Sequence, residues 1–162
     1  MISIVVCSKS KALFNQFSES VKKTIHIEYQ IIRINNTSSQ YSIGQAYNIG
    51  AEKSSYPIIC FCHEDLLFHS DNWGQSILDF HSIYRNSIGG IAGSTFLSKY
   101  PLSWWGSNQT EVVFKNLIQS SPSKNSVSYK INNENIEVLA LDGCFLTCTK
   151  EVWKNHKFDD IT

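Results

Sequence analysis

The stretch that decides the fold is PIICFCHEDLLFHS, residues 57–70. An almost unbroken apolar run ends abruptly at His63, Glu64 and Asp65, and a second apolar run follows them. A short continuous apolar run is typical of a strand that is buried on both faces. The sequence therefore predicts three titratable residues at the end of a buried strand.

Strand and helix patterns alternate on both sides of this stretch. Apolar runs of strand length are separated by segments in which apolar residues recur at helical spacing. The expected strands are residues 2–8, 27–34, 57–63 and 87–96, and the expected helices are residues 9–23, 42–54 and 72–85. This alternation predicts an α/β fold with an open, mostly parallel sheet and helices on both of its faces.

The pattern changes after Phe96. Residues 120–128 are polar and are expected to form a mobile loop. Residues 127–141 read as two alternating strands around a turn at 132–135, which predicts a small antiparallel hairpin region. Residues 141–153 form the final strand-like run.

Length and composition limit the possible functions. A chain of 162 residues fits a single domain. Positive and negative side chains balance, 14 against 14, so we expect no nucleic-acid partner. The N-terminal apolar run lacks a basic flank and is too short to cross a membrane, which predicts a cytoplasmic chain without an intrinsic membrane segment.

The five cysteines are an odd number, and each lies in an apolar context. We expect reduced core thiols. The remaining alternative is zinc, but the spacing of Cys60, Cys62 and His63 matches no structural zinc pattern.

The titratable triplet suggests a chemical role. Ligands of open parallel sheets bind beyond the carboxyl ends of the strands. Alternation along the strand places His63 and Asp65 on one side, where an imidazole and a carboxylate can bind a divalent cation that neutralises a diphosphate. The alternative is structural, with Asp65 as a cap or turn residue and His63 as a hydrogen-bonded core residue.

Four segments in order carry a family resemblance. They are ISIVVCS, SIGQAYNIGAEKS with its A-x-N-x-G core, IICFCHEDLLF and LDGCFLTCTKEVW. With this set the chain resembles the nucleotide-sugar-binding part of a GT-A glycosyltransferase of the family 2 type. It is most similar to the branch in which H-E/Q-D replaces D-x-D. The resemblance implies a nucleotide-diphospho-sugar transferase-like fold, with residues 1–96 binding the nucleotide and residues 97–162 on the acceptor side.

The resemblance also implies nucleotide-binding residues. Cys7 and Ser8, at the end of the first strand, match positions that contact the nucleotide. Asn35 and Asn36 match positions where relatives often place an acidic residue on the base, and an amide can both accept and donate there. Asn48 matches a polar residue that faces the nucleotide, and a structural hydrogen bond from helix to loop is the alternative.

The metal and the acceptor are assigned in the same way. Asp65 and His63 match the acids of D-x-D, which implies a substrate-dependent Mn²⁺ or Mg²⁺ site. Asp142 matches a residue beside the acceptor pocket, where it would bind sugar hydroxyls or cap the strand entry. Trp104 and Trp105 would stack on a sugar or pack beneath a loop.

The implied reaction is inverting transfer of a sugar from a nucleoside-diphosphate sugar to an acceptor hydroxyl. The acceptor is a glycan, a lipid-linked sugar or a small molecule, with peripheral association at the inner membrane of a bacterium as a further expectation. The expected general base lies beyond the end of the chain, so we expect a C-terminally truncated domain, with Asp159 or Asp160 as a weaker candidate. Two alternatives stay open: an inactive nucleotide-sugar-binding module and a sugar-phosphate nucleotidyltransferase.

Overall fold

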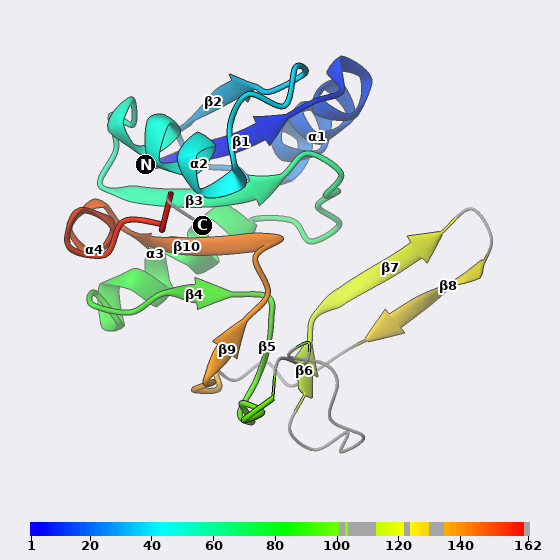
Figure 1. Ribbon diagram of the computed structural model, residues 1–162, viewed down its shortest axis with the longest axis vertical. Helices are drawn as coiled ribbons and strands as arrows, with labels where there is room; N and C mark the ends of the chain where they lie inside the picture. The colour runs from blue at the N-terminus through cyan, green and yellow to red at the C-terminus, as the bar shows by residue number, and fades with distance from the viewer. Residues whose placement is uncertain (101–102, 104–112, 122–123, 130–134, 161–162) are drawn as a thin grey trace. The chain divides into compact units, whose positions relative to one another are not determined.

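The computed structural model describes residues 1–100, 103, 113–121, 124–129 and 135–160 (Figure 1). The chain divides into two compact units, which are described separately. One unit combines Met1–Gly89 with Gly143–Thr162, and the other is Gly90–Asp142. The functional assignment of residues 1–96 and 97–162 stays a prediction.

The first unit is built on a five-stranded sheet with the order β2-β1-β3-β10-β4 (Figure 1). Its strands are β1 (Ile2–Ser8), β2 (Tyr29–Asn35), β3 (Ile58–His63), β4 (Gly89–Gly90) and β10 (Phe145–Thr149), and its helices are α1 (Lys11–Thr24), α2 (Ile43–Glu52), α3 (Trp73–Ile83) and α4 (Lys150–Asn155). Strand β1 pairs in parallel with β2 and β3, and β10 runs antiparallel to β3. The predicted α/β fold with a mostly parallel sheet is confirmed.

Alternation along the strands separates two apolar layers. On one face, Val5 and Phe61 pack with Tyr47 of α2 and Trp153 of α4. On the other face, the Trp73 ring of α3 lies 6.2 Å from the Phe145 ring, and its indole N–H donates to Thr24 of α1 at 2.9 Å. Helices therefore cover both faces of the sheet, as predicted.

Helix α2 packs closely on β1 because of one glycine. A Cβ at Gly50 would lie 2.1 Å from Cγ1 of Val5. The helix begins with a capping box, in which Ser42 accepts from the Gln45 N–H and the Gln45 side chain accepts from the Ser42 N–H. Local sequence thus fixes both the start of α2 and its distance from the sheet.

The final run of the sequence differs from the prediction. Residues 141–153 were expected as one strand, but the run is divided: Leu141 ends one strand, Phe145–Thr149 forms another, and α4 follows at Lys150. Thr149 causes the change because its hydroxyl accepts from the Val152 N–H at 3.2 Å, which caps the new helix.

The second unit consists of short antiparallel strands, which confirms a small antiparallel region, but the strands pair differently from the hairpin expected within residues 127–141. A three-stranded sheet has the order β6-β5-β9, with β5 (Ala92–Ser94), β6 (Val113–Lys115) and β9 (Ala140–Leu141). Strands β7 (Leu117–Ser121) and β8 (Lys124–Tyr129) pair as a hairpin. Residues 120–128 were expected as a mobile loop, and this prediction was wrong for the described part of the segment, because residues 120–121 belong to β7 and residues 124–128 belong to β8. Residues 122–123 lie outside the described residues.

Three further features bear on the predictions. The predicted fourth strand, 87–96, is divided into β4 and β5. The turn predicted at 132–135 falls largely outside the described residues. Within the described ranges, no helix is both long enough and apolar enough to cross a membrane.

The five cysteines all lie in the described part of the chain, and none of them forms a disulfide there. Burial raises the pKa of the Cys60 and Cys62 thiols, and it raises the pKa of Cys148 to about 11. These three are core thiols, as predicted, whereas Cys7 and Cys144 are half-buried.

Candidate functional site

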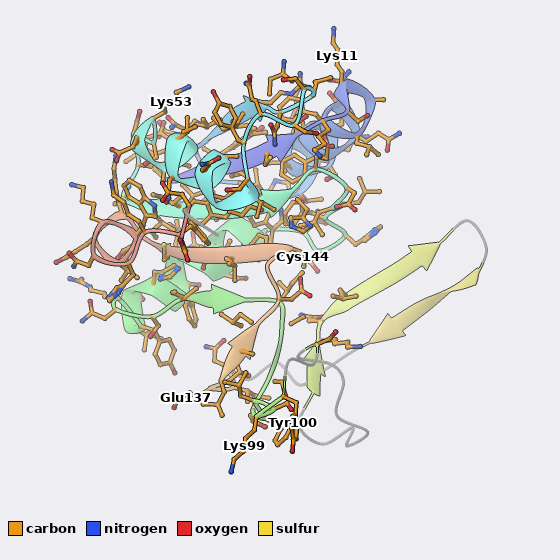
Figure 2. The ribbon with its side chains drawn as sticks, viewed as in Figure 1. Lys11, Lys53, Lys99, Tyr100, Glu137 and Cys144 are labelled. Atoms are coloured by element: carbon orange, nitrogen blue, oxygen red, sulfur yellow. The ribbon has the colours of Figure 1, made fainter. Side chains whose placement is uncertain are left out.

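The candidate site is the turn that follows β3, at the carboxyl edge of the sheet. Cys7 of β1 lies opposite His63, and the His63 N–H donates to the Cys144 carbonyl at 2.9 Å. Cys144, labelled in Figure 2, immediately precedes β10. Three neighbouring strands therefore end or begin at His63.

The three residues of the triplet differ in exposure. His63 and Glu64 are half-buried, and Asp65 is exposed. His63 lies two residues after Phe61 and therefore points to the face that α2 covers. Asp65 belongs to the turn that follows, where its carboxylate is open to solvent.

Glu64 binds the backbone on the opposite side of the strand. Its Oε1 accepts from the N–H groups of Lys9 and Ser10 at 3.0 and 3.1 Å, and its Oε2 accepts from Ser10 at 3.1 Å. The turn after β3 is thus tied to the segment that leads from β1 into α1.

The end of β1 is also held by β2. Arg33 donates from Nε to the Ser8 hydroxyl at 3.0 Å, and its guanidinium lies 4.8 Å from the centre of the Phe14 ring of α1. Ser8 is buried and Cys7 is half-buried. The side chain of Ser8 therefore has a structural partner, and its contact with a nucleotide stays a prediction.

The two asparagines after β2 organise their own loop. Asn36 is buried, accepts from the Tyr41 N–H at 3.0 Å and donates to the Tyr41 carbonyl at 2.9 Å. Exposed Asn35 accepts from the Thr37 hydroxyl at 2.6 Å. The predicted contact with a base stays untested for both, and Asn35 is the one that solvent reaches.

Asn48 has the structural role that the sequence left open. Its Oδ1 accepts from the indole N–H of Trp153 at 3.1 Å and from the Phe158 N–H at 3.2 Å, and its Nδ2 donates to the Phe158 carbonyl at 2.9 Å. A nucleotide contact by Asn48 stays a prediction. A surface depression of about 360 Å³ lies beside it, lined by Gln40, Tyr41, Gln45, Asn48, Ile49 and Asp160.

Tyr47 is a residue near the site that the sequence analysis did not single out. Its ring lies 5.1 Å from that of Phe61 and 5.3 Å from that of Phe158. The side chain is 2% exposed, and its buried hydroxyl has no hydrogen-bond partner in the described part of the protein. Burial raises the pKa of Tyr47, and the nearby thiols and Asp65 raise it further. The sequence gave no signal of this environment, because the helical spacing of Tyr47 indicates only that the residue is buried.

The predicted metal ligands are His63 and Asp65. Among the residues that the structure describes, no three His, Cys, Asp or Glu side chains gather closely enough to hold a metal ion. Within that part of the chain, the predicted pair is one imidazole and one carboxylate, and its role as a metal site stays a prediction.

The predicted acceptor residues lie in the second unit or outside the description. Asp142 ends the unit Gly90–Asp142, and its N–H donates to the Ala92 carbonyl at 2.9 Å. A Cβ on the following residue, Gly143, would meet nothing within 4 Å among the described atoms. Trp104 and Trp105 lie outside the described residues. The backbone of Asp142 is anchored, and the acceptor role of its side chain stays a prediction.

Comparison with known proteins addresses the family directly. A search of curated protein sequences gave no match. A family model described as glycosyltransferase like family matches residues 3–161, which covers nearly the whole chain. The chain therefore belongs to the glycosyltransferase-like family, with the GT-A family 2 type of fold and a general role in glycosyl transfer.

Proposed function

We propose that the chain binds a nucleoside-diphosphate sugar and transfers the sugar to an acceptor hydroxyl with inversion. One observation carries the proposal: exposed Asp65 lies two residues after half-buried His63, at the carboxyl end of β3 and beside the end of β1. Open sheets of this kind bind their ligands at this edge. Membership in the family indicates the class of reaction, glycosyl transfer. The turn after β3 contains the polar groups of the proposal, His63 and Asp65.

Asp65 and His63 are the proposed ligands of Mn²⁺ or Mg²⁺. One carboxylate and one imidazole make a weak site, and the imidazole favours Mn²⁺ over the harder Mg²⁺. A cation bound there would neutralise the charge of the leaving diphosphate. Because the described residues contribute only this pair, we expect cation binding to depend on the diphosphate oxygens of the donor.

The remaining residues have supporting roles in this proposal. Cys7 and Ser8 form the floor of the nucleotide site at the end of β1, and exposed Asn35 contacts the base. Asn36 and Asn48 shape the surrounding loops through the hydrogen bonds described above. Asp142 is the residue proposed to bind the hydroxyls of the acceptor.

Calorimetric titration with UDP and GDP tests the proposal. We expect one of the two nucleotides to bind only in the presence of Mn²⁺, and Asp65→Ala to weaken that binding by at least about tenfold, or ~1.4 kcal/mol. The reason is that the variant loses the only carboxylate of the proposed ligand pair.

Asp79→Ala is the matched control because Asp79 is an exposed carboxylate on α3 that accepts from Gln75 at 2.8 Å. It should bind like the wild type. Binding that ignores Mn²⁺ or Asp65→Ala would refute the metal role. Nucleotide binding without sugar transfer by the full protein would favour the inactive binding module, and diphosphate release from a nucleoside triphosphate would favour the nucleotidyltransferase.

A further inference from the structure

Glu64 is the middle residue of the triplet, and its carboxylate is already bound by the protein. Both of its oxygens accept from backbone N–H groups, at 3.0 Å from Lys9 and at 3.1 Å from Ser10. These partners lie 55 and 54 residues away in sequence. The contact therefore joins two strand ends that only the folded sheet brings together.

The partners of Glu64 belong to the start of α1. Ser10 is the N-cap of this helix, and its hydroxyl accepts from the Leu13 N–H at 3.3 Å. The backbone N–H of Ser10 thus points away from the helix and toward Glu64. A carboxylate at this end gains from the helix dipole, and hydrogen bonds to a charged acceptor are stronger than neutral ones.

The hydrogen bonds of Glu64 with Lys9 and Ser10 are one of several contacts that restrain the turn after β3. The His63 N–H is already fixed by the Cys144 carbonyl at 2.9 Å. Further along, the Phe68 N–H donates to the Ser20 hydroxyl of α1 at 3.2 Å. The segment from His63 to Phe68 is therefore anchored at three points, and Glu64 is the anchor next to Asp65.

We infer that Glu64 is a positioning residue for the donor site, which holds Asp65 and His63 in place through the N–H groups of Lys9 and Ser10. This inference rests on the proposed function of the turn. The inference also predicts which residues can replace Glu64. A glutamine keeps an oxygen that can accept from the same N–H groups, whereas an alanine has none.

The first experiment needs no ligand. Backbone ¹⁵N order parameters of Asp65 and Leu66 are measured for the wild type, Glu64→Ala, Glu64→Gln and Ser20→Ala. We expect lower order parameters only in Glu64→Ala, with Glu64→Gln close to the wild type. Ser20→Ala is the matched control because it removes the anchor of the same segment at Phe68, farther from Asp65. Unchanged order parameters in Glu64→Ala would overturn the inference.

The second experiment measures the affinity for UDP and GDP in the presence of Mn²⁺. We expect Glu64→Ala to weaken binding about tenfold, and Glu64→Gln and Ser20→Ala to stay within about threefold of the wild type. Both alanine variants should lower thermal stability, so a stability loss alone does not separate them. Wild-type affinity in Glu64→Ala would show that Glu64 only caps α1 and would overturn the inference.

The two experiments separate the inference from the proposed function. If the wild type binds neither nucleotide, the donor site is wrong, and the order parameters still decide whether Glu64 holds the turn. If the wild type binds a nucleotide and both Glu64 variants lose binding equally, the carboxylate charge matters rather than the anchor, which also contradicts the inference.

Discussion

Helix α2 and the turn after β3 both carry polar motif residues, yet hydrogen bonds use them differently. Asn48 on α2 makes three hydrogen bonds to Trp153 and Phe158. Asp65 in the turn is exposed, and the anchoring is done by its neighbour Glu64. One motif thus holds a chain segment together, and the other presents a carboxylate to solvent.

The difference shows that two polar residues of family motifs can have different roles. Membership in the motif does not separate a structural side chain from one that meets a ligand. The two kinds of side chain are distinguished by the hydrogen-bonding capacity that remains after folding. A side chain whose hydrogen bonds are all made inside the protein has few donors or acceptors left for a ligand. The stability of variants tests this distinction, because it shows how much each residue contributes to the free energy of unfolding.

Asn48→Ala should have the largest effect on stability. The change leaves the indole N–H of buried Trp153 and both backbone groups of Phe158 without their partner. Unsatisfied buried groups are costly, and we expect a loss of about 3 kcal/mol in the free energy of unfolding. Urea denaturation monitored by tryptophan fluorescence measures this loss.

Asp65→Ala is the matched test on the turn. An exposed side chain should change the free energy of unfolding by no more than about 0.5 kcal/mol. If the two variants lose the same stability, the distinction between a structural motif and an open one fails.

His81 extends the comparison to the face covered by α3, and its effect depends on pH. Its side chain is 3% exposed, and its Nε2 lies 2.8 Å from the Thr147 hydroxyl. Burial lowers the pKa of His81 below its usual 6.5. As pH falls below about 6.5, the unfolded chain therefore binds a proton that the folded protein does not. Stability should be complete above that pH and should fall below it, until the pH reaches the pKa of the folded state.

The measurement is the free energy of unfolding between pH 7.5 and pH 5, values that bracket the usual histidine pKa. Each unit of difference between the two pKa values is worth about 1.4 kcal/mol. His81→Leu should flatten this dependence, and His156→Gln, at an exposed position, should leave it unchanged. An equally steep fall in His81→Leu would assign the dependence to other groups.

The sheet was predictable because its signals are local. The apolar runs that became β1 and β3 are continuous in sequence, and alternation alone placed His63 on the side of Phe61. The hairpin of β7 and β8 was missed because these strands lack a clear run of apolar residues. Gln119 is polar, and Val127, which pairs with it, is an apolar residue between two serines. The cap that starts α4 was missed because Thr149 also suits a strand.

The candidate site was predicted less completely, for a related reason. A polar residue in sequence does not reveal its partner when that partner lies far along the chain. Glu64 meets Lys9 across 55 residues, and Asn48 meets Phe158 across 110. The sequence identified both residues, but only the fold shows what they bind.

Tyr47→Phe should cause no loss of stability, and it tests the comparison within α2 itself. Tyr47 precedes Asn48, but its buried hydroxyl has no partner among the described residues. Phenylalanine keeps the ring contacts with Phe61 and Phe158 and removes a group that is desolvated without compensation. We therefore expect the free energy of unfolding to stay the same or to rise by up to about 1 kcal/mol, measured in urea. Tyr56→Phe is the matched control, because the Tyr56 hydroxyl donates to Glu28 at 2.8 Å and its removal should lower stability slightly. A loss above about 1 kcal/mol in Tyr47→Phe would mean that the hydroxyl is hydrogen-bonded in solution, and Tyr47 would then belong with Asn48 among the structural residues.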